Sequence, residues 1–342
     1  MATTTRALRI VGLALGVLAA LLALGWGALA LHYHAPLLGG ALPIVWLIGG
    51  VVLLVSMRPA WRGIAAVAVI FALLLVWWSA IAPRNDRDWQ TDVAQLPTGT
   101  LDGDVLTLHN VRNFDYRSET DFTPRWETRT YDLAQLTGLD LFMSYWGSPS
   151  IAHTIMSWNF ADGQHLAISI ETRKQVGESY SAVAGFFKQY ELYYVVADER
   201  DVIRVRTNHR GEDVYLYHLR TPADRARAIL LDYVESMNAL AAQPKWYNAA
   251  THNCTTTIRT HVQRIGIAQP WDWRILVNGY ADQMLYERGG LDTSLPFADL
   301  RERSLIDPRA QAADQDPHFS ERIREGLPNP QRGPVSAPPP RG

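Results

Sequence analysis

The sequence contains little cysteine and, in its N-terminal part, little charge. Cys254 is the only cysteine among 342 residues, so the chain cannot form an internal disulfide. The first 83 residues contain four arginines and no lysine, aspartate or glutamate. The net charge of −2 gives no general basic character, so the composition does not indicate nucleic-acid binding. These absences separate an uncharged N-terminal part from a water-soluble remainder.

Uncharged apolar runs fill the N-terminal part and predict transmembrane helices. They cover residues 10–31, 37–57 and 63–82. Each run is close to the ~20 residues that cross a hydrocarbon core ~30 Å thick. A cleaved signal peptide is the alternative for the first run, but its length and the two runs behind it favour an anchor.

The arginines of this part predict its orientation in the inner membrane. Arg6 and Arg9 precede the first run, and Arg58 and Arg62 join the second run to the third. Residues 32–40, which join the first two runs, contain no lysine or arginine. Positively charged loops stay on the cytoplasmic side, so we expect a cytoplasmic N-terminus and a periplasmic domain after Pro83.

The remaining pattern predicts an α+β domain with an antiparallel sheet packed on helices. The expected parts are a three-helix transmembrane anchor at 1–83, a polar linker at 84–103, a domain at 104–306 and a disordered Pro-rich tail at 307–342. Alternating or apolar runs predict strands within 104–136 and at 139–146, 190–196, 202–205 and 214–219. A helix is expected after Thr221-Pro222, and a second helix ends at Gly266.

Residues 153–173 predict a β-hairpin with a defined register. Ala161-Asp162-Gly163 suits a three-residue turn in which Gly163 takes the left-handed conformation. Residues that face each other then have numbers that sum to 324. This register places Thr154, Met156 and Trp158 on an apolar face and puts His153 opposite Glu171 on the other face.

The position of Cys254 favours a nucleophilic thiolate. If Asn253 or Thr251 caps the second helix, the cysteine lies in its first turn, where unpaired N–H groups and the helix dipole favour negative charge. A thiolate is the reactive form of cysteine, and the same N–H groups can hold the oxyanion of an acyl intermediate. In an oxidising compartment a lone cysteine is a candidate reactive thiol, although a buried, inert cysteine is an equally ordinary explanation.

His153 is the candidate base and Glu171 its orienting carboxylate. Directly opposed side chains of a hairpin lie ~5 Å apart at Cβ, within reach for a carboxylate to hold an imidazole. His165 is the rival partner, but regular pairing places it roughly 20 Å along the hairpin from Glu171. A zinc site formed by His252, Cys254 and His261 would need a wider geometry than one helix provides, so no metal or other cofactor is expected.

Other residues near these positions are candidates for substrate binding. Arg173 shares the face of Glu171, and an arginine can clamp a phosphate or carboxylate; most other arginines on the predicted strands are expected to be solvated. Asn253 borders the thiol. Trp246 and Tyr247 could form the wall of an acyl pocket, and core packing explains them equally well.

Five segments of the chain together resemble a known domain family. They are IAHTIMSWNFADG, ISIETRKQVGESYS, QYELYYVVADERDVIRVRT, VYLYHL and YNAATHNCTTTI. They occur in order over roughly residues 104–265 and resemble the bacterial family named after the N-terminal periplasmic domain of the lipoprotein N-acyltransferase Lnb. The resemblance implies a circularly permuted papain-like (NlpC/P60-like), cysteine-dependent fold with Cys254 as nucleophile and His153 as base.

The resemblance also implies acyl transfer that involves lipids or lipoproteins at the outer face of the inner membrane. We therefore expect a membrane-anchored cysteine acyltransferase or acyl hydrolase whose partners are membrane lipid or lipoprotein substrates and not nucleic acid. Two alternatives remain open at this stage. One is a cysteine peptidase or amidase that acts on cell-wall peptides, and the other is a non-catalytic periplasmic binding domain.

Overall fold

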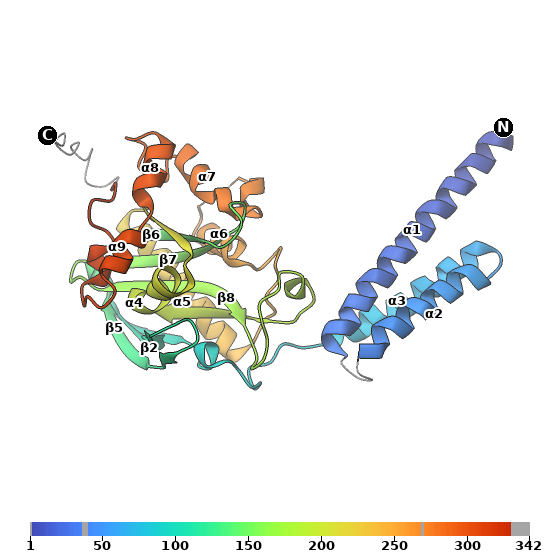
Figure 1. The fold of residues 1–342 in the computed structure, drawn as a ribbon, viewed down its shortest axis with the longest axis horizontal. Coiled ribbons are helices and arrows are strands. Elements are labelled where there is room, and N and C mark those ends of the chain that lie inside the picture. The colour runs from blue at the N-terminus through green and yellow to red at the C-terminus, as the bar shows by residue number, and fades with distance from the viewer. Residues whose placement is uncertain (1, 36–39, 268–269, 330–342) are drawn as a thin grey trace. The chain divides into compact units, whose positions relative to one another are not determined.

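The computed structural model describes residues 2–35, 40–267 and 270–329, shown in Figure 1. These residues form two compact units. The first unit contains the N-terminal helices up to Arg84 together with the segment Ser181–Gln189, and the second contains Asn85–Tyr180 and the chain from Tyr190 onward.

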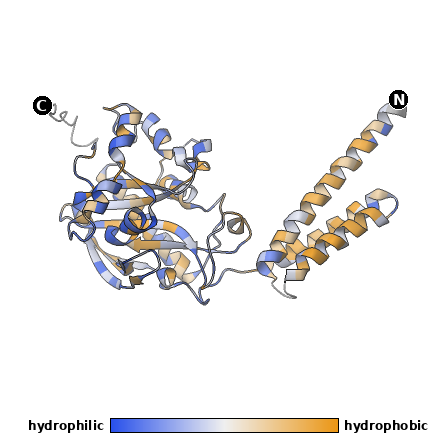
Figure 2. Cartoon of the chain, in the orientation of Figure 1, coloured by the Kyte–Doolittle hydropathy of each residue, from blue (hydrophilic) through white to orange (hydrophobic). Residues whose placement is uncertain are grey.

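Three apolar helices make up most of the first unit. They are α1 (Ala2–His34), α2 (Ala41–Ser56) and α3 (Ala60–Ala80). By length and composition α1 and α3 are long enough to cross a membrane, whereas α2 is a shorter apolar helix of 16 residues. Figure 2 shows how apolar these helices are. The run predicted from residue 37 begins outside the described residues, so the expected third crossing stays a prediction.

Glycines allow the three helices to pack closely. A Cβ atom added to Gly50 of α2 would lie 2.1 Å from the side chain of Leu24 on α1. A Cβ on Gly63 of α3 would lie 2.6 Å from the carbonyl oxygen of Leu53 on α2. Small residues at helix contacts are typical of membrane helices, which associate through close packing because lipid offers no hydrophobic driving force.

An eight-stranded sheet forms the centre of the described part of the second unit. Its strands are β1 (Thr98–Asp102), β2 (Val105–Arg112), β5 (Trp126–Asp132), β6 (Leu136–Tyr145), β7 (Ala152–Phe160), β8 (His165–Arg173), β9 (Glu191–Ala197) and β10 (Asp213–His218). Their order is β1-β2-β9-β8-β7-β6-β10, and β5 also pairs with β2. Two short strands, β3 (Asp115–Tyr116) and β4 (Phe122–Thr123), pair separately. The sheet is mixed and not purely antiparallel as expected, because β2 and β9 pair in parallel.

The β7–β8 hairpin has the predicted register. The paired residues run from Asn159↔His165 to Ile155↔Ser169, and each pair sums to 324. Gly163 adopts φ +85°, as a left-handed turn residue requires. The predicted pairs beyond this point, Thr154 with Ile170 and His153 with Glu171, are not formed, because the strands separate after Ile155↔Ser169.

Helices cover both faces of the sheet. They are α4 (Glu199–Val202), α5 (Ala223–Ala242), α6 (Cys254–Arg264), α7 (Ala281–Glu287), α8 (Phe297–Ser304), α9 (Asp307–Ala312) and α10 (Phe319–Arg322). On one face α5 contacts β6 and β9, and α6 contacts β7 and β8. The indole N–H of Trp158 donates to the carbonyl of Ala226 on α5. On the other face, residues of α4, α9 and α10 share a buried core with Phe142 and Ile155.

The segments expected to be linker and tail are folded. Val93 is buried in the core cluster, Trp89 and Leu96 pack against it, and residues 98–102 form β1. In the C-terminal part Ala310, Phe319 and Ile323 belong to the same core. The prediction of disorder from residue 307 is therefore wrong up to residue 329, since a few apolar side chains in a polar, Pro-containing segment suffice to dock it. Residues 330–342 lie outside the described part.

The strand predicted at 202–205 is also wrong. Asp198 caps a short helix by accepting a hydrogen bond from the amide of Arg200, and the chain continues into a π-helical turn at Val205–Arg210. Residues 202–205 are all buried, including Arg204. A short, mainly apolar run such as this one fits a buried strand and a buried helical turn equally well.

Candidate active site

Cys254 is the first residue of α6, and Asn253 caps this helix. The Asn253 side chain accepts a hydrogen bond of 2.8 Å from the amide of Thr256, and the Thr256 hydroxyl accepts one of 3.0 Å from the amide of Asn253. This reciprocal capping box satisfies two donors of the helix start. The amides of Cys254 and Thr255 remain in the first turn, where helix N–H groups have no acceptor within the helix.

The hairpin opens at the end that faces this helix start. Pairing between β7 and β8 stops at Ile155↔Ser169, while β7 continues to pair with β6 as far as Ala152, and β8 with β9 as far as Arg173. His153 therefore lies where two neighbouring strands separate. Thr154 on β7 contacts Thr255 on α6, with 3.4 Å between their hydroxyl oxygens.

Polar groups surround the imidazole of His153. Its Nε2 lies 2.6 Å from the hydroxyl of Ser169 and 3.4 Å from Oε1 of Glu171. The Ser169 hydroxyl donates to the same carboxylate oxygen over 2.8 Å. The imidazole and the Cys254 thiol are close enough that each shifts the pKa of the other.

A buried arginine stands behind the carboxylate. Arg206 donates to Oε1 of Glu171 over 3.1 Å and to Oε2 of Glu212 over 2.9 Å. Glu212 also accepts a hydrogen bond from the hydroxyl of Ser144. Glu171 is thus fixed from two sides and keeps its charge toward the imidazole.

These contacts shift the pKa values of the three central groups. Burial raises the pKa of the Cys254 thiol, but the hydrogen bond and charge of His153, with hydrogen bonds from Thr154, outweigh it and lower the pKa to about 6. Burial and the charge of Arg206 lower the pKa of His153, yet its bonds to Cys254 and Glu171 leave it raised. Burial raises the pKa of Glu171, whereas His153 and Arg206 lower it well below its ordinary value. Near neutral pH the favoured form is a thiolate beside an imidazolium.

Asn278 ties the two halves of this arrangement together and was not found by sequence reasoning. Its side chain accepts from the amide of Ala152 at 3.0 Å and donates to the carbonyl of the same residue at 2.6 Å. The side-chain nitrogen of Asn278 also lies 2.8 Å from the hydroxyl oxygen of Thr255 and 3.6 Å from the sulfur of Cys254. It therefore fixes the start of β7 against the start of α6. Gly279 follows because a Cβ there would lie 2.2 Å from the carbonyl oxygen of Pro149.

Two predicted substrate-binding residues have structural contacts instead. The Arg173 guanidinium is 2% exposed and donates to the carbonyls of Val93 and Ala94, which hold the folded segment before β1. The Asn253 amide is occupied by the helix cap and by a hydrogen bond to the carbonyl of Ala249. The shared face with Glu171 indicated Arg173, but the arginine that reaches this carboxylate is Arg206.

The two predicted aromatic residues lie in different surroundings. Tyr247 is buried, hydrogen-bonds Tyr180 and is close enough to Cys254 for a thiolate to raise the pKa of its phenol, although burial is the larger cause. Trp246 is half-buried and carries the guanidinium of Arg87 over its ring at 5.4 Å. Tyr247 thus lies near the thiol, together with Tyr180.

Known proteins were compared with this chain, and one family model matches. Residues 122–279 match the Lnb N-terminal periplasmic domain. This part of the chain is similar to that family. No curated protein and no solved structure matches the chain.

The Lnb N-terminal periplasmic domain contains every group described around the thiol. His153, Ser169, Glu171, Arg206 and Asn278 all lie within the matched residues, as does Cys254. The two long apolar helices and this periplasmic family together indicate a membrane protein with a periplasmic domain.

Other histidines of the domain lie away from the thiol or in structural contacts. His165 pairs with Asn159 at the turn end of the hairpin. His261 is 1% exposed and is held between Asp232 and the hydroxyl of Tyr194. His252 precedes the helix cap and contacts the hydroxyl of Thr251. Among the described residues, no three His, Cys, Asp or Glu side chains are grouped to hold a metal ion.

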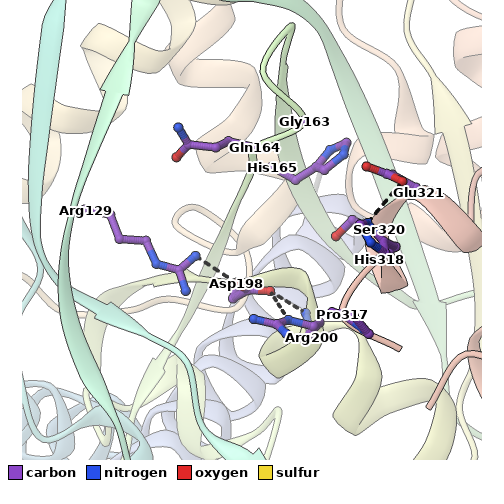
Figure 3. Close-up of a pocket in the computed structure, with 10 residues that line it drawn as sticks. All are labelled: Arg129, Gly163, Gln164, His165, Asp198, Arg200, Pro317, His318, Ser320 and Glu321. Atoms are coloured by element: carbon purple, nitrogen blue, oxygen red, sulfur yellow. Dashed lines mark hydrogen bonds and ion pairs between the residues drawn. The ribbon is translucent and has the colours of Figure 1, made fainter. Parts of the chain in front are cut away.

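A cavity of about 190 Å³ lies at the turn end of the hairpin, as Figure 3 shows. It is lined by Arg129, Gly163, Gln164, His165, Asp198, Arg200, Pro317, His318, Ser320 and Glu321. The start of β7 lies roughly 30 Å along the strand from this turn. The arginines of the cavity bond to Asp198, and His318 faces Glu321, so its charged groups are mutually paired.

The thiol site is only partly exposed to solvent. Cys254 is 7% exposed, whereas the side chains of His153 and Glu171 are 13% and 22% exposed. A thiol, an imidazole held by a carboxylate and the N–H groups of a helix start are the groups that acyl transfer through a cysteine uses.

Proposed function

We propose that this protein is a membrane-anchored periplasmic cysteine acyltransferase or acyl hydrolase that acts on lipid or lipoprotein esters. The observation that carries the proposal is the contact of the Cys254 thiol at the start of α6 with His153, whose ring is held by Ser169 and Glu171. The match of residues 122–279 to the Lnb N-terminal periplasmic domain supports it.

The proposed reaction begins with attack of the Cys254 thiolate on an ester carbonyl. The developing oxyanion accepts hydrogen bonds from the amides of Cys254 and Thr255 in the first turn of α6. As the carbon–oxygen bond of the ester breaks, the His153 imidazolium gives its proton to the departing alcohol, which leaves a thioester on Cys254.

A second step releases the acyl group. An amine or a water molecule attacks the thioester carbonyl and loses a proton to His153, while the carbon–sulfur bond breaks and restores the thiolate. An amine acceptor gives an amide and makes the enzyme a transferase, whereas water gives a free acid and makes it a hydrolase. Throughout both steps Glu171 holds the ring and offsets its positive charge.

In the proposed topology the N-terminus is cytoplasmic and three helices cross the membrane. The 16 residues of α2 extend ~24 Å at 1.5 Å per residue, slightly less than a ~30 Å core. Local thinning or flanking residues can accommodate such a difference. Alkaline phosphatase fused after Pro83 should be active in the periplasm; an inactive, cytoplasmic fusion would contradict this topology.

Mass spectrometry of the intact protein tests the reaction. The full chain is reconstituted in vesicles of phosphatidylethanolamine and phosphatidylglycerol, with or without an acylated lipoprotein, and Cys254→Ser serves as the control. We expect a hydroxylamine-sensitive fatty-acyl adduct on Cys254 and none on the variant. An adduct formed only with peptide substrates would replace the proposal by a peptidase or amidase. A thiol that gives no adduct and resists alkylation near neutral pH would support a binding domain.

A further inference from the structure

The segment Ser181–Gln189 leaves the sheet between β8 and β9 and belongs to the unit of apolar helices. It carries no charge before Lys188. Within it Ala184–Phe186 form a 3-10 turn in which Ala184 and Gly185 are buried. The segment packs with apolar helices and has little charge, so its exposed side chains contact either water or lipid.

Lys188 attaches this segment to the end of α3. Its ammonium group donates to the carbonyls of Trp78 at 2.8 Å and Ile81 at 3.3 Å, and it lies 4.0 Å from the centre of the Trp78 ring. The last carbonyl groups of a helix receive no hydrogen bond from within the helix, and they form the negative end of its dipole. A cation therefore stabilises them. Lys188 adopts φ 54°, which is uncommon for a residue with a side chain.

Phe187 attaches the segment to the end of α1. Its ring is 5% exposed and lies 5.6 Å from the rings of both Trp26 and Tyr33. Its carbonyl oxygen meets the imidazole of His34, near the last residues of α1. Tryptophan, tyrosine and lysine at the ends of apolar helices are typical of the membrane–water interface. The segment is therefore fixed at the level where these helices leave the bilayer.

Apolar side chains of this segment remain exposed. Val183 and Phe186 are 49% and 47% exposed, although the buried residues Ala184, Gly185 and Phe187 surround them in the chain. In water two such side chains would be left uncovered, whereas at the bilayer surface the acyl chains would cover them. Their continuity with the helix ends identifies lipid as the occupant.

We propose that Ser181–Gln189 is a membrane-inserted loop whose Val183 and Phe186 side chains enter the leaflet that faces the soluble domain. The residue before it is Tyr180, whose pKa is raised mainly by burial. The interaction with Tyr247 lowers this pKa and the charge of Cys254 raises it, so Tyr180 lies near both residues. If the proposed function holds, the direct chain connection from this loop to Tyr180 gives the loop a role in lipid delivery. The insertion itself does not depend on the reaction.

Spin labels test the insertion without any assay of activity. In the full-length Cys254→Ser background, single cysteines replace Val183, Val69 on α3 or Val105 on β2; all three valines are well exposed, at 49%, 60% and 46%. The labelled proteins are reconstituted in phosphatidylethanolamine–phosphatidylglycerol vesicles. Collisions with oxygen and with a water-soluble nickel chelate then report lipid and water contact. We expect position 183 to behave like position 69; behaviour like position 105 overturns the proposal.

Kinetics test the role of the loop in lipid delivery. Val183→Asp and, as a matched control, Val105→Asp are assayed with vesicle phospholipid and with a short-chain water-soluble ester. We expect Val183→Asp to lose about tenfold or more with vesicles, because a charge resists entry into the leaflet, and to change less than about twofold with the soluble ester. Equal losses on both substrates contradict delivery. A wild-type protein inactive on both substrates contradicts the proposed function, and the spin labels still decide on insertion.

Discussion

The two ends of the β7–β8 hairpin carry similar polar groups but differ in what those groups face. At the open end His153, Ser169 and Glu171 meet Arg206 and the thiol. At the turn end His165 pairs with Asn159, and Arg324 binds Asp140, Glu199 and Asn159. Both ends thus contain a histidine, carboxylates and an arginine that is buried or partly buried.

The histidines of the two ends have opposite pKa shifts. Burial and Arg324 lower the pKa of His165, and the nearby carboxylates do not compensate. Burial and Arg206 also act on His153, but the thiol and Glu171 bond directly to its ring and raise its pKa. Buried charge networks are therefore common to structural and candidate catalytic parts. The interaction of the imidazole with a thiol at a helix start is the feature that separates the two ends.

Among the changes predicted for the two ends of the hairpin, removal of the Cys254 sulfur should have the largest effect. Cys254→Ala keeps a small residue at the start of α6 and leaves the Asn253 cap intact. Because no other cysteine exists, we expect the acyl adduct to vanish and turnover to fall by about a thousandfold or more. Turnover of lipid esters with the wild-type rate in this variant would assign the chemistry to another residue.

Loss of Arg324 should be the largest effect at the turn end, and it concerns stability. Arg324→Met leaves Asp140 and Glu199 buried at 1% and 0% exposure without their shared cation. We expect a loss of about 3–5 kcal/mol at neutral pH, measured by chemical denaturation of the full chain in micelles. Arg324 lowers the pKa of both carboxyls. This stabilisation is therefore present above the unfolded-state pKa of the two carboxyls and fades as the pH falls. Acid should therefore reduce the difference in free energy of unfolding between the wild type and Arg324→Met.

Arg322→Met is the matched control for that prediction. It is the last residue of α10, two residues before Arg324, but its side chain is 53% exposed and its partners are Asp316 and Glu325 at the surface. An exposed pair contributes at most about 1 kcal/mol. Equal stabilities of the two variants would show that the buried cluster does not hold the C-terminal segment.

This C-terminal segment also shows where sequence reasoning reaches its limit. The hairpin register, the turn at Gly163 and the cap at Asn253 follow from short-range patterns, and the structure confirms them. The docking of Phe319 and Arg324 depends on contacts with strands more than 100 residues earlier. A local pattern of polar residues and prolines contains no sign of such contacts, so disorder was predicted instead.

The same limit applies to the candidate site. His153 and Glu171 are brought together as predicted, because both lie on one hairpin. Ser169 lies on the same predicted face and could have been found from the register. Arg206 and Asn278 come from a π-helical turn and a short 3-10 helix whose positions no periodicity fixes. Their roles and those of Cys254 and His153 in a reaction remain predictions.

Replacement of His153 and of His165, each by alanine, should affect the pKa of the Cys254 thiol differently. We expect the pH midpoint of Cys254 alkylation to move from about 6 in the wild type to ~8.5 or above in His153→Ala. At pH 6 the thiolate fraction falls by roughly 150-fold, but a more basic thiolate is about tenfold more nucleophilic, so the rate should drop about tenfold. The midpoint is the clearer readout.

His165→Ala serves as the control on the same hairpin. His165 bonds to Asn159 and not to the thiol, so its removal should leave the midpoint within a few tenths of a pH unit of the wild type. A shift of the same size in both variants would mean that the hairpin as a whole, and not the imidazole of His153, sets the thiol pKa.

The smallest expected effect separates two carboxylates that share Arg206. Glu171 and Glu212 both bind its guanidinium, at 3.1 Å and 2.9 Å, but only Glu171 contacts His153. Glu171→Gln keeps the shape and removes a charge that raises the pKa of His153. The imidazolium then becomes less favoured, the thiolate loses part of its partner, and the alkylation midpoint should rise by about one pH unit. Glu212→Gln should change the midpoint by no more than a few tenths; an equal rise in both variants would show that the charge balance around Arg206, and not the contact with His153, tunes the thiol.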